Sequence, residues 1–292
     1  MRSPTFMALA AFAAASIAVS GAASAASENW RARSSAEDEV SSNDVAAEVA
    51  FGREISARIL GRYKTYKDAK LTKYVSLVGL ALTRNTNRPE LEYHFTILDS
   101  DEVNAFAAPG GYVFITKGAL LLMKDEAELA GVLAHEIEHI AEMHVVKDLK
   151  IKGADDSATS GLARLAGGST ESARAAFSQA IDKGFEMVFK DAYKRSDELQ
   201  SDRGAVIVCA LSGYDASALA RYLARVRTVK GEVAETGTVT EQTHPSFAVR
   251  IAQINSVITS DGVDISGLAT NQKRFDMAMN IAMPKGRRWA GD

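Results

Sequence analysis

The segment His135-Glu136-Ile137-Glu138-His139 constrains both the structure and the chemistry of this chain. Two histidines four residues apart lie about one turn apart on a helix, so both rings can face the same metal ion. Glu136 directly follows His135, where its carboxylate can reach a water in the site without binding the metal. Zinc lowers the pKa of such a water towards about 7, and a carboxylate then accepts its proton. The segment predicts a helical zinc site with a general base.

A catalytic zinc site needs a third protein ligand. The metzincin arrangement would place a histidine at position 145, which is Val145. His144 lies about 140° round an unbroken helix from His139, so we interpret it as a solvated histidine or as a partner outside the metal's own ligands. Glu198 could instead supply the ligand, and Asp202, four residues later, could accept a hydrogen bond from a ligating histidine. Such an acidic pair is also common on a solvated helix face.

Hydrophobic periodicity predicts an α+β fold that is mostly helical, with a small β-sheet beside the zinc-binding helix. Residues 91–98 and 111–117 alternate as strands do, and Pro109-Gly110-Gly111 is a turn signal before the second strand. Helical spacing occupies about residues 44–60, 69–84, 125–140, 170–189, 194–211, 215–227, 245–258 and 268–282.

The two ends of the chain differ from this globular pattern. A basic start, an apolar stretch over residues 6–19 and Ala23-Ser24-Ala25 predict a signal peptide over residues 1–25, cleaved after Ala25, and a periplasmic or secreted location. We expect a flexible N-terminal segment over 26–44, a zinc metallopeptidase domain over 45–284 and a C-terminal tail over 285–292.

Composition narrows the possible partners. The formal charge of −3 argues against a nucleic-acid partner, which calls for a basic excess. After the signal peptide no apolar run reaches membrane-spanning length, so we expect no transmembrane segment in the mature chain. The single cysteine, Cys209, lies in an apolar helical stretch and is predicted to be a core thiol, so disulfides cannot stabilise this chain.

Four separated blocks carry a resemblance to a known family, over about residues 45–260. The chain resembles the zinc metalloendopeptidases that include prenyl-CAAX endopeptidases and membrane heat-shock endopeptidases, and is most similar to the soluble periplasmic β-barrel-assembly-enhancing type. We expect no membrane helices and no tetratricopeptide array to accompany the domain, which leaves the substrate class open. The blocks are Asn104–Gly118, His135–His144, Arg195–Gly204 and Thr243–Ile251.

The resemblance implies a zincin-like (gluzincin) domain with one Zn²⁺ per chain, held by the two histidines of the motif and by Glu198, with Asp202 beside them. It also places His244 near the metal, where the ring could stabilise an oxyanion, close the open coordination position, or merely start a helix. Arg250 could support the same region or pair with a surface acid.

The block from Asn104 implies an edge strand along a substrate cleft. An extended peptide could pair with Asn104, Ala105, Phe106 and Ala107 through main-chain hydrogen bonds, which favours unfolded or extended protein substrates. Residues 153–170, rich in small residues between the two ligand helices, are predicted to form a lid.

These features predict a zinc-dependent metalloendopeptidase that hydrolyses peptide bonds in exported proteins, in envelope protein quality control. Glu136 is the expected base and His244 the expected second catalytic group. One alternative is a zinc-binding, chaperone-like or latent regulatory protein in which His244 closes the site. Another is a purely structural helical protein with a fortuitous motif. The sequence leaves the oligomeric state unknown.

Overall fold

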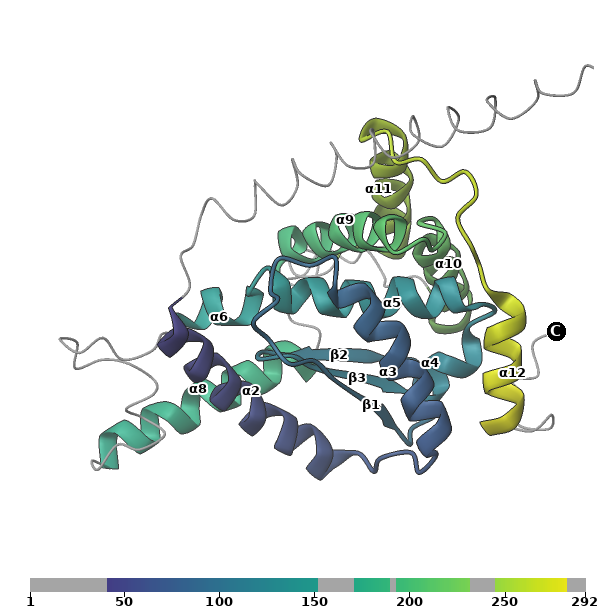
Figure 1. The fold of residues 1–292 in the computed structure, drawn as a ribbon. Coiled ribbons are helices and arrows are strands. Elements are labelled where there is room, and N and C mark those ends of the chain that lie inside the picture. The colour runs from purple at the N-terminus through teal and green to yellow at the C-terminus, as the bar shows by residue number, and fades with distance from the viewer. Residues whose placement is uncertain (1–40, 152–170, 190–192, 232–244, 283–292) are drawn as a thin grey trace, which may run out of the picture.

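The computed structural model describes residues 41–151, 171–189, 193–231 and 245–282 (Figure 1). The predicted signal peptide, the predicted lid at 153–170, His244 and the predicted tail lie outside these residues. Among the helices of the described ranges, none is both long enough and apolar enough to cross a membrane.

Helices make up most of the described chain and accompany a three-stranded sheet, which confirms the α+β expectation. The helix α2 begins inside the segment that was expected to be flexible, because Ser41 and Asp44 form a capping box at its start. The elements are α2 (Ser42–Arg62), α3 (Ala69–Thr83), β1 (His94–Leu98), β2 (Ala105–Ala108), β3 (Tyr112–Thr116), α4 (Lys117–Leu122), α5 (Glu126–Ala141), α6 (His144–Leu149), α8 (Glu171–Phe189), α9 (Arg195–Leu211), α10 (Ala218–Lys230), α11 (Phe247–Ser260) and α12 (Gln272–Ala282).

The sheet has the strand order β1-β3-β2, so β2 is an edge strand. β1 pairs with β3 in parallel, with His94 opposite Tyr112, and β2 pairs with β3 antiparallel. The β2–β3 turn requires glycine, because Gly110 and Gly111 have φ angles of 77° and 99°. Gly110 also lies so close to Val49 of α2 that a Cβ there would be 2.6 Å from the Val49 Cα. The turn therefore fixes β2 against α2.

The helix α5 runs through the middle of the molecule, between the sheet and α9 (Figure 1). All of its residues are buried, and it packs against α3, α9, α10 and β2. Asp125 caps its N-terminus by accepting a hydrogen bond from the Glu128 backbone N–H, which confirms the predicted start. Such burial holds the 135–139 segment rigidly, as a metal site needs.

Buried charges secure both ends of α5. At the N-terminal end, Glu126 is wholly buried and accepts hydrogen bonds from the hydroxyls of Tyr74 and Tyr214 and from Arg274 of α12. At the other end, Arg88 donates to the Ile140 carbonyl and to Glu48 of α2. These hydrogen bonds pair buried charged side chains, which would destabilise the core if they had no partner.

Candidate metal centre

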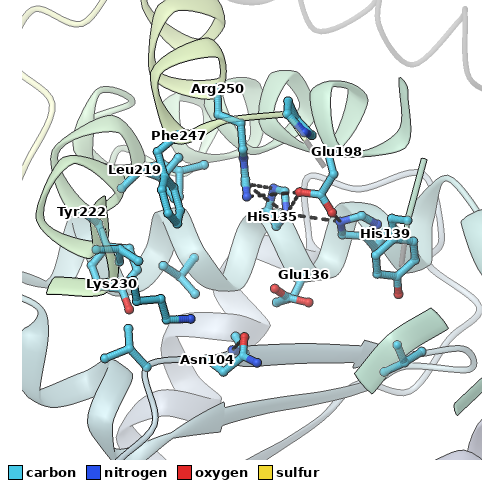
Figure 2. A pocket seen from close by; sticks show the side chains of 18 of the residues that line it. Asn104, His135, Glu136, His139, Glu198, Leu219, Tyr222, Lys230, Phe247 and Arg250 are labelled. Carbon is cyan, nitrogen blue, oxygen red and sulfur yellow. Dashed lines mark hydrogen bonds and ion pairs between the residues drawn. The ribbon is translucent and has the colours of Figure 1, made fainter. Parts of the chain in front are cut away.

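Three side chains from two helices converge on one point. The Nε2 atoms of His135 and His139 lie 3.1 Å apart. The Glu198 carboxylate, from α9, lies 3.6 Å from each of these nitrogens (Figure 2). Ligands about 2.0–2.1 Å from a tetrahedral zinc ion lie about 3.3 Å from one another. The spacing of these three groups therefore fits a tetrahedral metal site. Within the described residues, they form a cluster of His and Glu side chains whose ligand atoms are close enough together to hold one ion.

The surroundings shift the pKa values of the two histidines in opposite directions. Burial, together with the neighbouring rings of His135 and His144, holds the pKa of His139 well below its usual value, so this ring is neutral and keeps a lone pair for a metal. Burial also lowers the pKa of His135, but the carboxylates of Asp202 and Glu198 outweigh burial and raise it overall. The surroundings of His135 therefore favour a positive charge on the ring, and a bound metal cation would supply that charge in place of the proton.

Asp202 and Arg250 form a buried pair behind His135. The wholly buried Asp202 carboxylate lies 3.0 Å from His135 Nδ1 and accepts hydrogen bonds from Arg250 at 2.6 and 2.8 Å. Burial alone would raise the pKa of Asp202, but Arg250 and His135 lower it to about 2. Asp202 is placed to accept the His135 Nδ1–H bond, which leaves Nε2 turned to the metal point.

Arg250 was expected either to support the metal region or to pair with a surface acid. The structure places it at the metal centre. Its side chain is 13 % exposed, and its Nη1 lies 3.1 Å from Glu198. One guanidinium group thus binds both carboxylates that α9 contributes. Figure 2 shows Arg250 entering from α11 above His135 and Glu198.

His144 reaches the site because the helix is broken. Met143 has a left-handed φ of 56°, which ends α5 and turns the chain into α6. The ring of His144 then lies with its Nδ1 3.0 Å from Nδ1 of His139 and its Nε2 3.3 Å from the side-chain amide oxygen, Oε1, of Gln200. The assumption of an unbroken helix was therefore wrong. Of the two interpretations of His144, a solvated histidine or a partner of a metal ligand, the structure agrees with the second. His139 Nδ1–H can donate to His144, whose Nε2–H donates to Gln200.

A cavity of about 440 Å³ opens in front of the metal point. Glu136 lines it, 9 % exposed, with its carboxylate on the side that faces Asn104 (Figure 2). Away from the three potential ligands the wall is largely apolar. It is formed by Val103, Asn104, Ala105, Val132, Val188, Tyr193, Leu219, Tyr222, Leu223, Val226, Lys230, Gly231, Pro245 and Phe247.

The predicted cleft strand is only partly at the cavity. Asn104 and Ala105 line it, but Phe106 and Ala107 do not. Phe106 packs beneath the sheet against Tyr63 and Phe189, because side chains of a strand alternate between its two faces. Ala107 is 2 % exposed, and its carbonyl accepts a hydrogen bond from Tyr193.

Sequence reasoning missed Tyr193 and the apolar wall from α10 and α11. Tyr193 stacks on His139 with ring centroids 3.9 Å apart. Its position two residues before α9, near Glu198, was the available signal. The wall residues Leu219, Tyr222 and Phe247 resemble ordinary core residues in sequence, and nothing in their spacing separates a cavity wall from a core.

Glu138 is a buried acid that the site does not use. Its side chain is wholly buried, and neither of its oxygens has a hydrogen-bond partner in the described chain. Burial raises the pKa of this carboxyl well above its usual value. Gly204 of α9 makes room for it, since a Cβ there would lie 2.1 Å from a Glu138 oxygen. Glu138 therefore points to α9 and not into the cavity.

Comparison with known proteins agrees with this geometry. Residues 69–258, which hold all three potential ligands, match the model of Peptidase family M48. The chain is 28 % identical over 185 residues to the putative beta-barrel assembly-enhancing protease of Vibrio cholerae, covering 61 % of this chain and 37 % of that protein. It is 25 % identical over 186 residues to the beta-barrel assembly-enhancing protease of Escherichia coli K12, covering 62 % and 38 %.

A third relative is the metalloprotease YcaL of Escherichia coli K12, 31 % identical over 136 residues that cover 44 % of this chain and 49 % of that protein. The chain spans little more than a third of the length of the two beta-barrel assembly-enhancing proteases. The family model, by contrast, matches well over half of this chain. This chain therefore belongs to peptidase family M48.

Proposed function

We propose that this chain is a zinc-dependent metalloendopeptidase with a zincin-like (gluzincin) domain. The observation that carries the proposal is the convergence of His135, His139 and Glu198 beside a cavity that Glu136 also lines. These three residues would hold one Zn²⁺. When bound, the ion supplies Lewis-acid chemistry, which polarises a peptide carbonyl and lowers the pKa of water in the site.

The residues of the chain perform the remaining steps. Asp202 holds the His135 ring through Nδ1, and Arg250 binds the carboxylates of both Asp202 and Glu198 and keeps them in place. The Glu136 carboxylate accepts a proton from water during attack on the peptide carbonyl and then donates it to the leaving amine. His244 is the proposed second catalytic group, either for the oxyanion or as a group that closes the site in a latent form.

The proposed substrates are unfolded or extended protein segments. The edge strand β2 begins at the cavity, where Ala105 lines it, and a peptide could add to this strand by main-chain hydrogen bonds. By analogy with the beta-barrel assembly-enhancing proteases, we place the activity in quality control of exported proteins, in the periplasm or outside the cell. The cleavable signal peptide over residues 1–25 belongs to this proposal.

Proteolysis of unfolded casein tests the proposal. The zinc-loaded protein is expected to cleave casein, to stop in the presence of a chelator, and to recover when zinc is restored. Retention of one zinc per chain without any casein cleavage would support the chaperone-like or latent regulatory alternative. If the purified protein bound no zinc, the result would support the second alternative, a purely structural helical protein in which the motif is fortuitous.

Replacing His144 is expected to weaken zinc binding. In His144→Ala, His139 loses the partner that fixes its tautomer, and such losses cost about 10- to 100-fold in metal affinity. His144→Asn should recover part of the affinity, because the asparagine oxygen can accept the bond from His139 Nδ1–H. Competition with a chromophoric chelator measures the dissociation constant.

The matched control is His94→Ala, which removes an exposed strand histidine that stacks on Tyr112. It should leave zinc affinity unchanged. Equal affinities for the wild type and His144→Ala would show that His144 does not act on the metal site.

A further inference from the structure

The outward-facing backbone of β2 offers an incoming peptide few pairing groups. The Thr116 N–H donates to the Asn104 carbonyl, so the backbone of Asn104 faces β3. Because the pairing alternates along an antiparallel strand, Phe106 and Ala108 also face β3. The N–H and C=O groups of Ala105 and Ala107 therefore point away from the sheet. These are the groups that an added strand would use.

Tyr193 already occupies one of these groups. Its hydroxyl donates to the Ala107 carbonyl at 3.2 Å, and the side chain is buried. Its ring is held in place by the stack on His139, at an interplanar angle of 29°. At the neighbouring position, the Ala105 N–H bonds to the side chain of Asn104, at 3.0 Å. Asn104 can release that bond by rotating about its side-chain torsions, whereas the Tyr193 ring is buried and held by its stack on His139.

We propose that Tyr193 ends the peptide-binding edge of β2. It thereby limits how many residues of an extended substrate can pair with this strand. The inference rests on the proposed function, because it assumes that peptides bind along β2. A peptide strand pairs with Ala105, but it meets the Tyr193 phenol before it reaches the carbonyl of Ala107. Tyr193 is thus a specificity-determining residue that favours short extended segments over long paired strands.

Removing the hydroxyl alone would leave the ring over the Ala107 carbonyl, so the test removes the whole side chain. Tyr193→Ala frees the Ala107 carbonyl, and metal analysis checks that the variant still holds one zinc per chain. Tyr63→Ala is the matched control, since it removes another tyrosine side chain, one that packs against Phe106 and does not line the cavity. Both variants are made in the full chain, zinc-loaded and carrying Glu136→Gln so that peptides bind without being cut.

The probe is a series of fluorescein-labelled peptides of alternating threonine and valine, in which length increases one residue at a time. Fluorescence anisotropy gives the affinity for each length. For the Glu136→Gln parent and the Tyr63→Ala control, affinity should stop rising at the same length. For Tyr193→Ala it should continue to rise for about two residues more, the strand spacing from Ala105 to Ala107. The added gain should be about two- to tenfold, as one backbone hydrogen bond contributes.

An unchanged length profile in Tyr193→Ala would overturn the inference, as would an equal shift in Tyr63→Ala. A uniform loss of affinity at every length would also overturn it, because it would assign the Tyr193 side chain to peptide binding itself. The outcome is independent of the casein assay. A shifted profile without casein cleavage would sustain the peptide-binding edge and reject the peptidase proposal, and the reverse result would reject only the role of Tyr193.

Discussion

Glu136→Gln is expected to lower the rate of casein cleavage by about 10²- to 10⁴-fold, the usual contribution of a general acid–base group. The glutamine keeps the size and polarity of the side chain but cannot accept a proton from water. Zinc content should stay the same, because Glu136 is not among the three groups that converge on the metal point. Quenched-flow or steady-state assays of a labelled casein, with metal analysis of the same preparation, provide the measurement.

The matched control is Glu138→Gln, the same substitution two residues later on the same helix. Glu138 faces Gly204 of α9 and does not line the cavity. The rate of casein cleavage by Glu138→Gln should stay close to that of the wild type. Comparable losses in the two variants would mean that the effect comes from disturbing α5 and not from removing a base.

Arg250→Met is expected to lower the free energy of unfolding by about 3–5 kcal/mol, the cost of leaving buried charges without their partner. Asp202 is wholly buried and Glu198 nearly so, and Arg250 binds both. Methionine fills a similar length but provides no charge. Without Arg250 the two carboxylates face each other, and the loss should be largest in the metal-free protein, where no cation compensates Glu198. Urea unfolding with and without zinc measures both values.

Arg203→Met is the control for this prediction. Arg203 pairs with Asp261 at the surface, with side chains 44 % and 31 % exposed. Solvent screening limits such a pair to about 0–1 kcal/mol. If Arg250→Met proved no more destabilising than Arg203→Met, the buried network around Asp202 would contribute little to stability.

The local part of the site could be predicted from the sequence. His135, Glu136 and His139 lie on one helix, so their spacing alone placed them together. Glu198 and Asp202 lie on one face of another helix for the same reason. That these two faces meet depends on the packing of α5 against α9, which is tertiary. Only the resemblance to known peptidases anticipated it.

What could not be predicted depended on single backbone positions and on packing. A left-handed Met143 is unusual for a side chain of this type, and no glycine or asparagine marked the break that brings His144 to His139. The helices α10 and α11 begin a few residues later than expected, at Ala218 and Phe247. Phe106 was assigned to the cleft, although alternation along β2 turns it into the core.

X-ray absorption at the zinc edge of the purified protein tests the central claim most directly. We expect one zinc per chain, with two imidazole nitrogens and a carboxylate oxygen at about 2.0–2.2 Å. In Glu198→Ala the two imidazoles should remain, but the carboxylate oxygen should be lost and the zinc should be held more weakly. Zinc bound with an unchanged spectrum in Glu198→Ala, or no zinc in the wild type, would contradict the account.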